Sequence, residues 1–163
     1  MVPDFVDLID ANYDQDADFN AQPQTPSEQK ELLLTLINAF RWYFNVQPVT
    51  LDEQVSVIAQ AHAEDMIKKN YFDHLNPWTN EGPQDRARKA GIRRHIGENL
   101  AYSSNITFAH LYLSRSPSHL EIMVSEEFKT VGFGIVRDEK NKGFMIVEDF
   151  AGRDYVENPL TGP

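Results

Sequence analysis

The spacing of the apolar residues changes along the chain from a helical period to an alternation, and this change limits the folds available. Between residues 33 and 66, apolar side chains recur every three or four positions in two stretches, which is typical of amphipathic helices. Residues 130–136 and 143–150 alternate as strands do, and Asn141-Lys142-Gly143 between them predicts a hairpin turn. Such a chain has to bury helices against a sheet.

Two segments have the pattern of a helix start. In Thr25-Pro26-Ser27-Glu28, Thr suits the N-cap, Pro the first helical position and Glu the third, from which it can reach back to the cap amide. Thr50-Leu51-Asp52-Glu53 has a similar capping-box pattern. We therefore expect one helix that ends near Asn45 and a second that runs to about Asn70.

The remaining segments predict short elements around one further strand. A helix is expected to begin at Pro83 and to end at Gly91, residues 108–113 read as another helix, and a third short one begins at Ser116-Pro117. Residues 96–103 read as a strand with Glu98 on the same face as Leu100 and Tyr102. The predicted fold is α+β, an α-β-α sandwich in which helices flank a small antiparallel sheet of about three strands.

Charge divides the chain into parts. Of its 163 residues, the first 28 hold seven acids and no Lys or Arg, which leaves 18 acids against 15 bases in the rest. We expect an acidic N-terminal extension at 1–26, one domain at 27–153 and a C-terminal tail at 154–163. No basic stripe suits a phosphate backbone, so nucleic acid is not an expected partner.

Two kinds of feature are missing from the sequence. The chain has no cysteine, which excludes disulfides and thiolate metal sites. No run of residues is long and apolar enough to span a bilayer, and residues 1–20 are acidic where a secretory signal would be basic and then apolar.

Eight short segments, in their order and spacing, give the chain a family resemblance. It resembles the bacterial, cysteine-free type of the CAP superfamily, which includes the cysteine-rich secretory, antigen 5 and pathogenesis-related proteins (SCP-like domains). The segments that carry the resemblance are Asn38 with Arg41, Ala61-His62-Ala63 with Asp65-Met66, Phe72-Asp73-His74, Asp85-Arg86 with Ala90-Gly91, Gly97-Glu98-Asn99-Leu100-Ala101, Ser116-Pro117-Ser118-His119, Val131-Gly132-Phe133-Gly134 and Glu148-Asp149-Phe150.

The resemblance implies an α-β-α sandwich with a cleft that holds two histidines and one or two glutamates. His74, Glu98 and His119 match these positions. A second glutamate of many eukaryotic members has no counterpart between residues 106 and 118, and Leu120 stands where bacterial members usually have Arg. Glu121 is a nearby acid that could compensate. The resemblance also implies an extracellular or cell-envelope location, with any signal or anchor not contained in this chain.

The residues themselves allow two interpretations of this site. His74, Glu98 and His119 could bind a divalent metal, with Zn²⁺ the expected ion, and leave a fourth position for water. They could instead form a hydrogen-bonded polar cluster without metal. His62 lies on the apolar stripe of the second helix and could line the cleft or orient a ligand.

Two functional hypotheses follow. The first is a monomeric, non-enzymatic binding module whose cleft can take a metal and a lipid or protein ligand. The second is a metal-dependent hydrolase in which Glu98 acts as general base. The missing acid and Arg favour the first.

Overall fold

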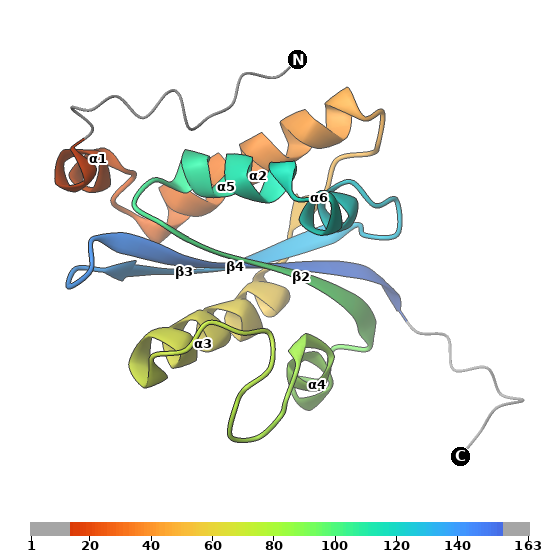
Figure 1. Ribbon diagram of the computed structural model, residues 1–163. Coiled ribbons are helices and arrows are strands. Elements are labelled where there is room, and N and C mark those ends of the chain that lie inside the picture. Colours follow the sequence, from red (N-terminus) through yellow and green to blue (C-terminus); the bar gives the residue numbers. More distant parts are fainter. Residues whose placement is uncertain (1–13, 155–163) are drawn as a thin grey trace, which may run out of the picture.

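Helices cover both faces of a central sheet, as Figure 1 shows for the computed structural model, which describes residues 14–154. Helices α1, α2, α5 and α6 lie on one face, and α3 and α4 lie on the other. The elements follow the order α1 (Gln15–Ala21), α2 (Pro26–Tyr43), β1 (Thr50–Leu51), α3 (Glu53–Lys69), α4 (Pro83–Lys89), β2 (Arg94–Ser103), α5 (Ile106–Arg115), α6 (Pro117–Met123), β3 (Thr130–Asp138) and β4 (Gly143–Asp154). The predicted α-β-α sandwich is confirmed.

The sheet has one more strand than predicted. Its order is β1-β3-β4-β2, with β3–β4 and β4–β2 antiparallel and the two-residue β1 parallel to β3. The predicted hairpin is confirmed, with Asp138 paired to Gly143 across the turn. Because β1 is so short, no alternation in the sequence could signal it.

The two long helices begin close to where their capping patterns predicted. The side chain of Thr25 accepts a hydrogen bond from the amide of Glu28 at 3.2 Å, with Pro26 at the start of α2. In α3 the cap is Asp52, which accepts from the amide of Val55 at 3.1 Å. The capping box predicted from Thr50 is wrong, because the amide of Thr50 bonds to the carbonyl of Lys129 beside β3 instead.

Helix α1 was not predicted and lies within the segment assigned to the acidic extension. Its Phe19 is fully buried and packs on Phe144 of β4, with ring centroids 5.1 Å apart. The guanidinium of Arg137 lies 3.8 Å from the Phe19 ring centre. Sequence reasoning missed α1 because a seven-residue helix anchored by one aromatic ring leaves no periodic pattern. Residues 1–13 and 155–163 lie outside the described part.

Two glycines let α3 lie directly on β3. A Cβ on Gly132 would lie 2.3 Å from the amide nitrogen of Ser56, and one on Gly134 would lie 2.1 Å from the carbonyl oxygen of Ala59. Any side chain there would push the helix off the sheet. This close approach brings the middle and C-terminal end of α3 over β4 and towards β2, where the candidate site lies.

Arg41, which stands with Asn38 in the first of the family segments, lies near the end of α2 and has a structural role. Its side chain is fully buried, and its guanidinium donates to the carbonyls of Gln47, Met123, Ser125 and Phe128 at 2.6–3.2 Å. One arginine thereby ties the end of α2 to the segment that follows α6.

Candidate functional site

Glu98, His74 and Arg86 form one hydrogen-bonded group, here called the His74 cluster. Glu98 lies in β2 on the sheet face covered by α3 and α4, and is 5% exposed. Its Oε1 accepts a hydrogen bond from Nδ1 of His74 at 2.8 Å, and its Oε2 accepts from Nη2 of Arg86 at 2.7 Å. Both oxygens of this buried carboxylate are therefore engaged with charged or polar partners.

The segment between α3 and α4 carries His74 to this position. Helix α3 stops at Asn70, whose φ of 56° is left-handed. Within the segment, the side chain of Asn76 accepts from the amides of Trp78 and Thr79 at 2.9 and 3.2 Å. Arg86 of α4 also donates to the carbonyl of His74 at 3.0 Å. Arg86 thus joins the strand and the segment that carries His74.

His62 supports the cluster from α3. Its Nε2 lies 2.9 Å from the carbonyl oxygen of Asp73, next to His74, and 4.0 Å from Oε1 of Glu98. The side chain is almost fully buried, and burial is the main cause that lowers the pKa of His62. A neutral imidazole that donates to Asp73 positions the backbone beside His74.

Electrostatics make Glu98 an anion. Burial alone would raise the pKa of Glu98, but the hydrogen bond from His74 and the charge of Arg86 outweigh burial and hold the pKa below its ordinary value. The same hydrogen bond raises the pKa of His74. Because Nδ1 of His74 bonds to Glu98, Nε2 is the ring nitrogen left for a ligand, and the side chain is 47% exposed.

Asp149 lies opposite Glu98 on β4 and is fully buried. Burial raises its pKa well above the ordinary value, and the negative charge of Glu98 raises it further. Burial and the neighbouring anion thus both favour the protonated form of Asp149. It and Arg86 belong to the site, and sequence analysis placed neither there, although both stand in motif segments (Asp85-Arg86 and Glu148-Asp149).

His119 lies on α6, across β2 from the cluster. Its carbonyl accepts a hydrogen bond from the side chain of Asn99 at 3.1 Å. Burial lowers the pKa of His119, and the positive charge of His74 lowers it further. The two imidazoles are thus close enough to interact, but no hydrogen bond or ion pair between described residues joins His119 to His74 or Glu98. Glu121, proposed as a compensating acid, is exposed on α6.

Among the described residues, the structure does not gather His74, Glu98 and His119 into one group of metal ligands, and the zinc site stays a prediction. An open zinc site uses three protein ligands. Here both oxygens of Glu98 carry hydrogen bonds, and one of the donors is the cation of Arg86. Within residues 14–154, no group of three or more His, Cys, Asp or Glu side chains is placed to hold a metal ion. The geometry favours the interpretation as a polar cluster.

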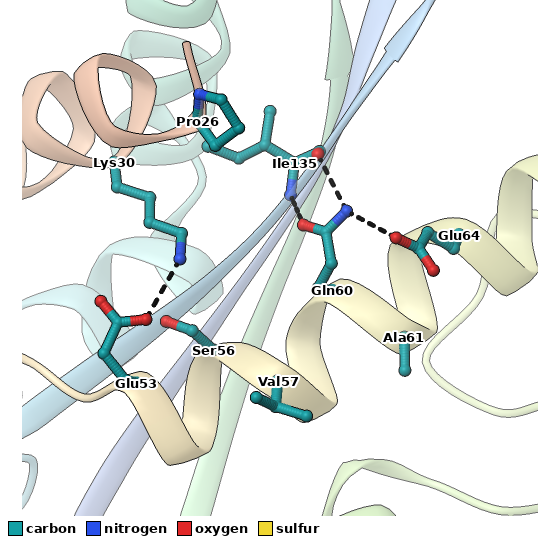
Figure 2. Close-up of a pocket in the computed structure, with 9 residues that line it drawn as sticks. All are labelled: Pro26, Lys30, Glu53, Ser56, Val57, Gln60, Ala61, Glu64 and Ile135. Atoms are coloured by element: carbon teal, nitrogen blue, oxygen red, sulfur yellow. Dashed lines mark hydrogen bonds and ion pairs between the residues drawn. The ribbon is translucent and has the colours of Figure 1, made fainter.

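A separate hollow of about 530 Å³ lies between the start of α2 and α3 (Figure 2). At its rim, Lys30 and Glu53 form an ion pair at 3.4 Å. On its floor, the side chain of Gln60 donates to the carbonyl of Ile135 and accepts from its amide, at 3.1 and 2.8 Å. These polar groups are paired with one another, and the hollow does not include the His74 cluster.

Comparison with known proteins identifies the family. Residues 34–150 match the model of CAP, the cysteine-rich secretory protein family. The chain belongs to this family. Its CAP domain is 29% identical over 133 residues to the uncharacterized protein YkwD of Bacillus subtilis and 26% identical over 125 residues to the uncharacterized membrane protein YlbC of the same organism. These matches cover 80% and 75% of this chain, but the chain spans only 50% and 35% of those relatives.

Solved structures share the CAP fold. An extracellular protein with an SCP domain from Bacillus anthracis is 25% identical, with a TM-score of 0.68 over 82% of this chain and 45% of that one. An outer surface protein of Borrelia burgdorferi is 18% identical, with a TM-score of 0.73 over 82% of this chain and 98% of that one. Among the described residues, no helix has the length and apolar character needed to cross a membrane.

Proposed function

We propose that this CAP domain is an extracellular or cell-surface recognition module that binds a protein ligand at the His74 cluster. The observation that carries the proposal is the double engagement of Glu98 by His74 and Arg86. A carboxylate held from both sides does not need to move during binding. It fixes the segment that carries His74, and a fixed surface loses less entropy when a partner binds.

The segment around His74 presents apolar side chains to solvent. Phe72 is 54% exposed, Leu75 is 45% exposed and Trp78 is 64% exposed. The ring of Trp78 packs edge-on against Tyr71, and the ammonium of Lys69 lies 5.4 Å from its centre. Aromatic residues held in a defined position and open to solvent are characteristic of protein-binding surfaces.

The extracellular location rests on the related proteins. The Bacillus anthracis structure, described as an extracellular protein, is 25% identical to this chain over the aligned residues. A surface location would place the His74 cluster where it can meet partners outside the cell.

The alternative hydrolase reading gains no support from Glu98. An effective general base has a pKa near the pH at which it works. Arg86 and His74 hold the pKa of Glu98 below its ordinary value, and each of its two oxygens already accepts a hydrogen bond. A polar cluster used for recognition accounts for these contacts without catalysis.

The proposal can be tested by selecting binders from a phage library of linear twelve-residue peptides. We expect selected peptides to bind the wild type and to lose at least ten-fold in affinity against His74→Ala and Trp78→Ala. Trp42→Ala is the matched control, since Trp42 is 82% exposed at the far end of α2. Selection of no peptide, or equal losses with Trp42→Ala, would overturn the proposal. Vesicles of neutral and anionic lipid serve as a separate arm, and binding to them alone would point to a lipid ligand instead.

A further inference from the structure

Strand β2 forms one edge of the sheet beside the His74 cluster. It pairs with β4 on one side and with no strand of the described chain on the other. The amide of Ile96 points outward, where it donates to the side chain of Gln84 at 3.1 Å. Because backbone groups alternate in direction along a strand, the amides and carbonyls of Glu98, Leu100 and Tyr102 also point outward.

The chain caps its sheet edges elsewhere with side chains. On β3, Ser56 accepts from the amide of Phe133 at 3.1 Å, and Gln60 pairs with Ile135 as Figure 2 shows. At the start of β2, the Gln84 side chain also donates to the carbonyl of Arg94 at 2.9 Å. These side chains occupy hydrogen-bonding groups that would otherwise attract another strand.

The middle of β2 lacks such a cap. In residues 14–154, no side chain or backbone group bonds to the outward amides and carbonyls of Glu98, Leu100 and Tyr102. The side chain of Leu100, 6% exposed, packs into the core beneath α3, while its outward backbone groups lie at the sheet edge. In Figure 1, β2 crosses between α5 and α6 on one side and the segment linking α3 to α4 on the other.

A hollow lies at the far end of this edge. It has a volume of about 370 Å³. Its lining is mostly apolar or aromatic (Met66, Ile67, Tyr71, Phe72, Tyr102 and Met145), with Asn70, Asp138 and Asn141 as its polar members. Phe72 and Tyr102 are 54% and 41% exposed, while the two methionines are buried. Methionine adapts its shape to an incoming group, so the hollow suits an apolar side chain of variable form.

We propose that an extended peptide segment of a partner protein adds to β2 as a further strand. Its backbone would bond to the outward groups of Glu98, Leu100 and Tyr102, and one of its apolar side chains would enter the hollow beside Tyr102. Backbone pairing supplies affinity in this mode of recognition, and the pocket for a side chain supplies specificity. The inference rests on the proposed function, since it names the form of the protein ligand.

The spacing of the outward amides and carbonyls along β2 favours an extended peptide as the ligand. Outward groups two residues apart repeat about every 7 Å, and Glu98 to Tyr102 spans about 14 Å of strand. Only an extended polypeptide offers donors and acceptors at this repeat, whereas a lipid chain or a metal ion offers neither. About five peptide residues would therefore reach from the His74 cluster to the hollow.

Single N-methylation along the selected peptide tests the pairing. In an added strand, alternate amides point towards β2, so methylation at every second position should weaken binding at least ten-fold and methylation between them should not. On the protein, Tyr102→Pro removes the outward amide at a strand edge, where proline is tolerated. Tyr102→Ala removes the same side chain and keeps that amide. We expect at least ten-fold weaker binding for the Pro variant than for the Ala variant, with both shown to be folded by circular dichroism.

The outcomes separate this inference from the proposed function. Peptides that depend on His74 and Trp78 but show no alternating pattern, with equal affinities for the two Tyr102 variants, would overturn strand addition and leave recognition standing. Failure to select any peptide would overturn both. Weaker binding at alternate methylated positions, together with weaker binding to Tyr102→Pro than to Tyr102→Ala, would support both strand addition and the proposed function.

Discussion

Nη2 of Arg86 lies 2.7 Å from Oε2 of Glu98, and the two side chains are 13% and 1% exposed. This pair joins α4 to β2, and through the carbonyl of His74 it also holds the segment that precedes α4. The arrangement of α4, β2 and the segment around His74 therefore depends on a contact between two charges that water hardly reaches.

Removing the cation should destabilise the protein. Arg86→Ala leaves the carboxylate of Glu98 buried with one partner fewer, and breaking a buried pair costs about 3 kcal/mol or more. Urea denaturation at pH 7 measures the free energy of unfolding. The control is Arg88→Ala on the same helix, whose ion pair with Asp85 is exposed, and it should change that free energy by less than about 0.5 kcal/mol. Equal losses in the two variants would contradict the role of the Arg86 pair.

Zinc should add little stability. Any ion that binds the folded state alone raises the melting temperature with its concentration. Since the oxygens of Glu98 are engaged, we expect the same melting temperature after chelation with EDTA as with equimolar Zn²⁺. A rise of several degrees with zinc, lost in both His74→Ala and His119→Ala, would restore the metal site predicted from the sequence.

The buried carboxyl group of Glu148 should make the free energy of unfolding depend on pH in an unusual way. Burial raises its pKa to about 8, and neither of its carboxyl oxygens has a hydrogen-bond partner among the described residues. In the unfolded chain this carboxyl loses its proton near pH 4.5, so the folded state holds the proton over a window in which the unfolded state does not. Its contribution to stability is therefore full below about pH 4.5 and falls as the pH rises towards 8.

Glu148→Gln should remove this dependence. The amide is neutral at every pH and can donate to the Oδ1 of Asn99, which lies opposite on β2 and has no partner among the described residues. We expect a variant that is more stable than the wild type at pH 7.5 and equally stable near pH 4, measured by urea denaturation. The exposed Glu121→Gln serves as control and should follow the wild type. Wild-type behaviour of Glu148→Gln across that range would show that Glu148 is already ionised in the fold.

Gly134 should tolerate no side chain. A Cβ there would meet the carbonyl of Ala59 at 2.1 Å, so Gly134→Ala should lower the free energy of unfolding by about 3 kcal/mol or more. Gly152→Ala is the matched control in the same hairpin, because its nearest neighbour, the carbonyl of Glu127, would lie at 3.4 Å. Thermal melts of the two variants give the comparison, and similar melting temperatures would mean that α3 can move off β3 without cost.

Local patterns in the sequence were sufficient for most elements of the fold. Three features depend on residues close in the chain, and the sequence pattern therefore predicts them directly. They are the helix cap at Thr25, the apolar stripe of α3 and the alternation of the strands on both sides of Lys142. The parallel strand β1 and the helix α1 depend instead on distant partners, Val131 and Phe144. No local pattern can report such contacts.

The sequence by itself determined that the chain is an α-β-α sandwich of the CAP type, and it singled out His74, Glu98 and His119. Only the tertiary structure decided which of them meet. It joined His74 to Glu98, placed His119 across β2 without a bond to either, and brought in Arg86 and Asp149. The physical reason is that a buried carboxylate must find hydrogen-bond donors in three dimensions. Which donors it finds depends on how α4 and β4 lie against β2.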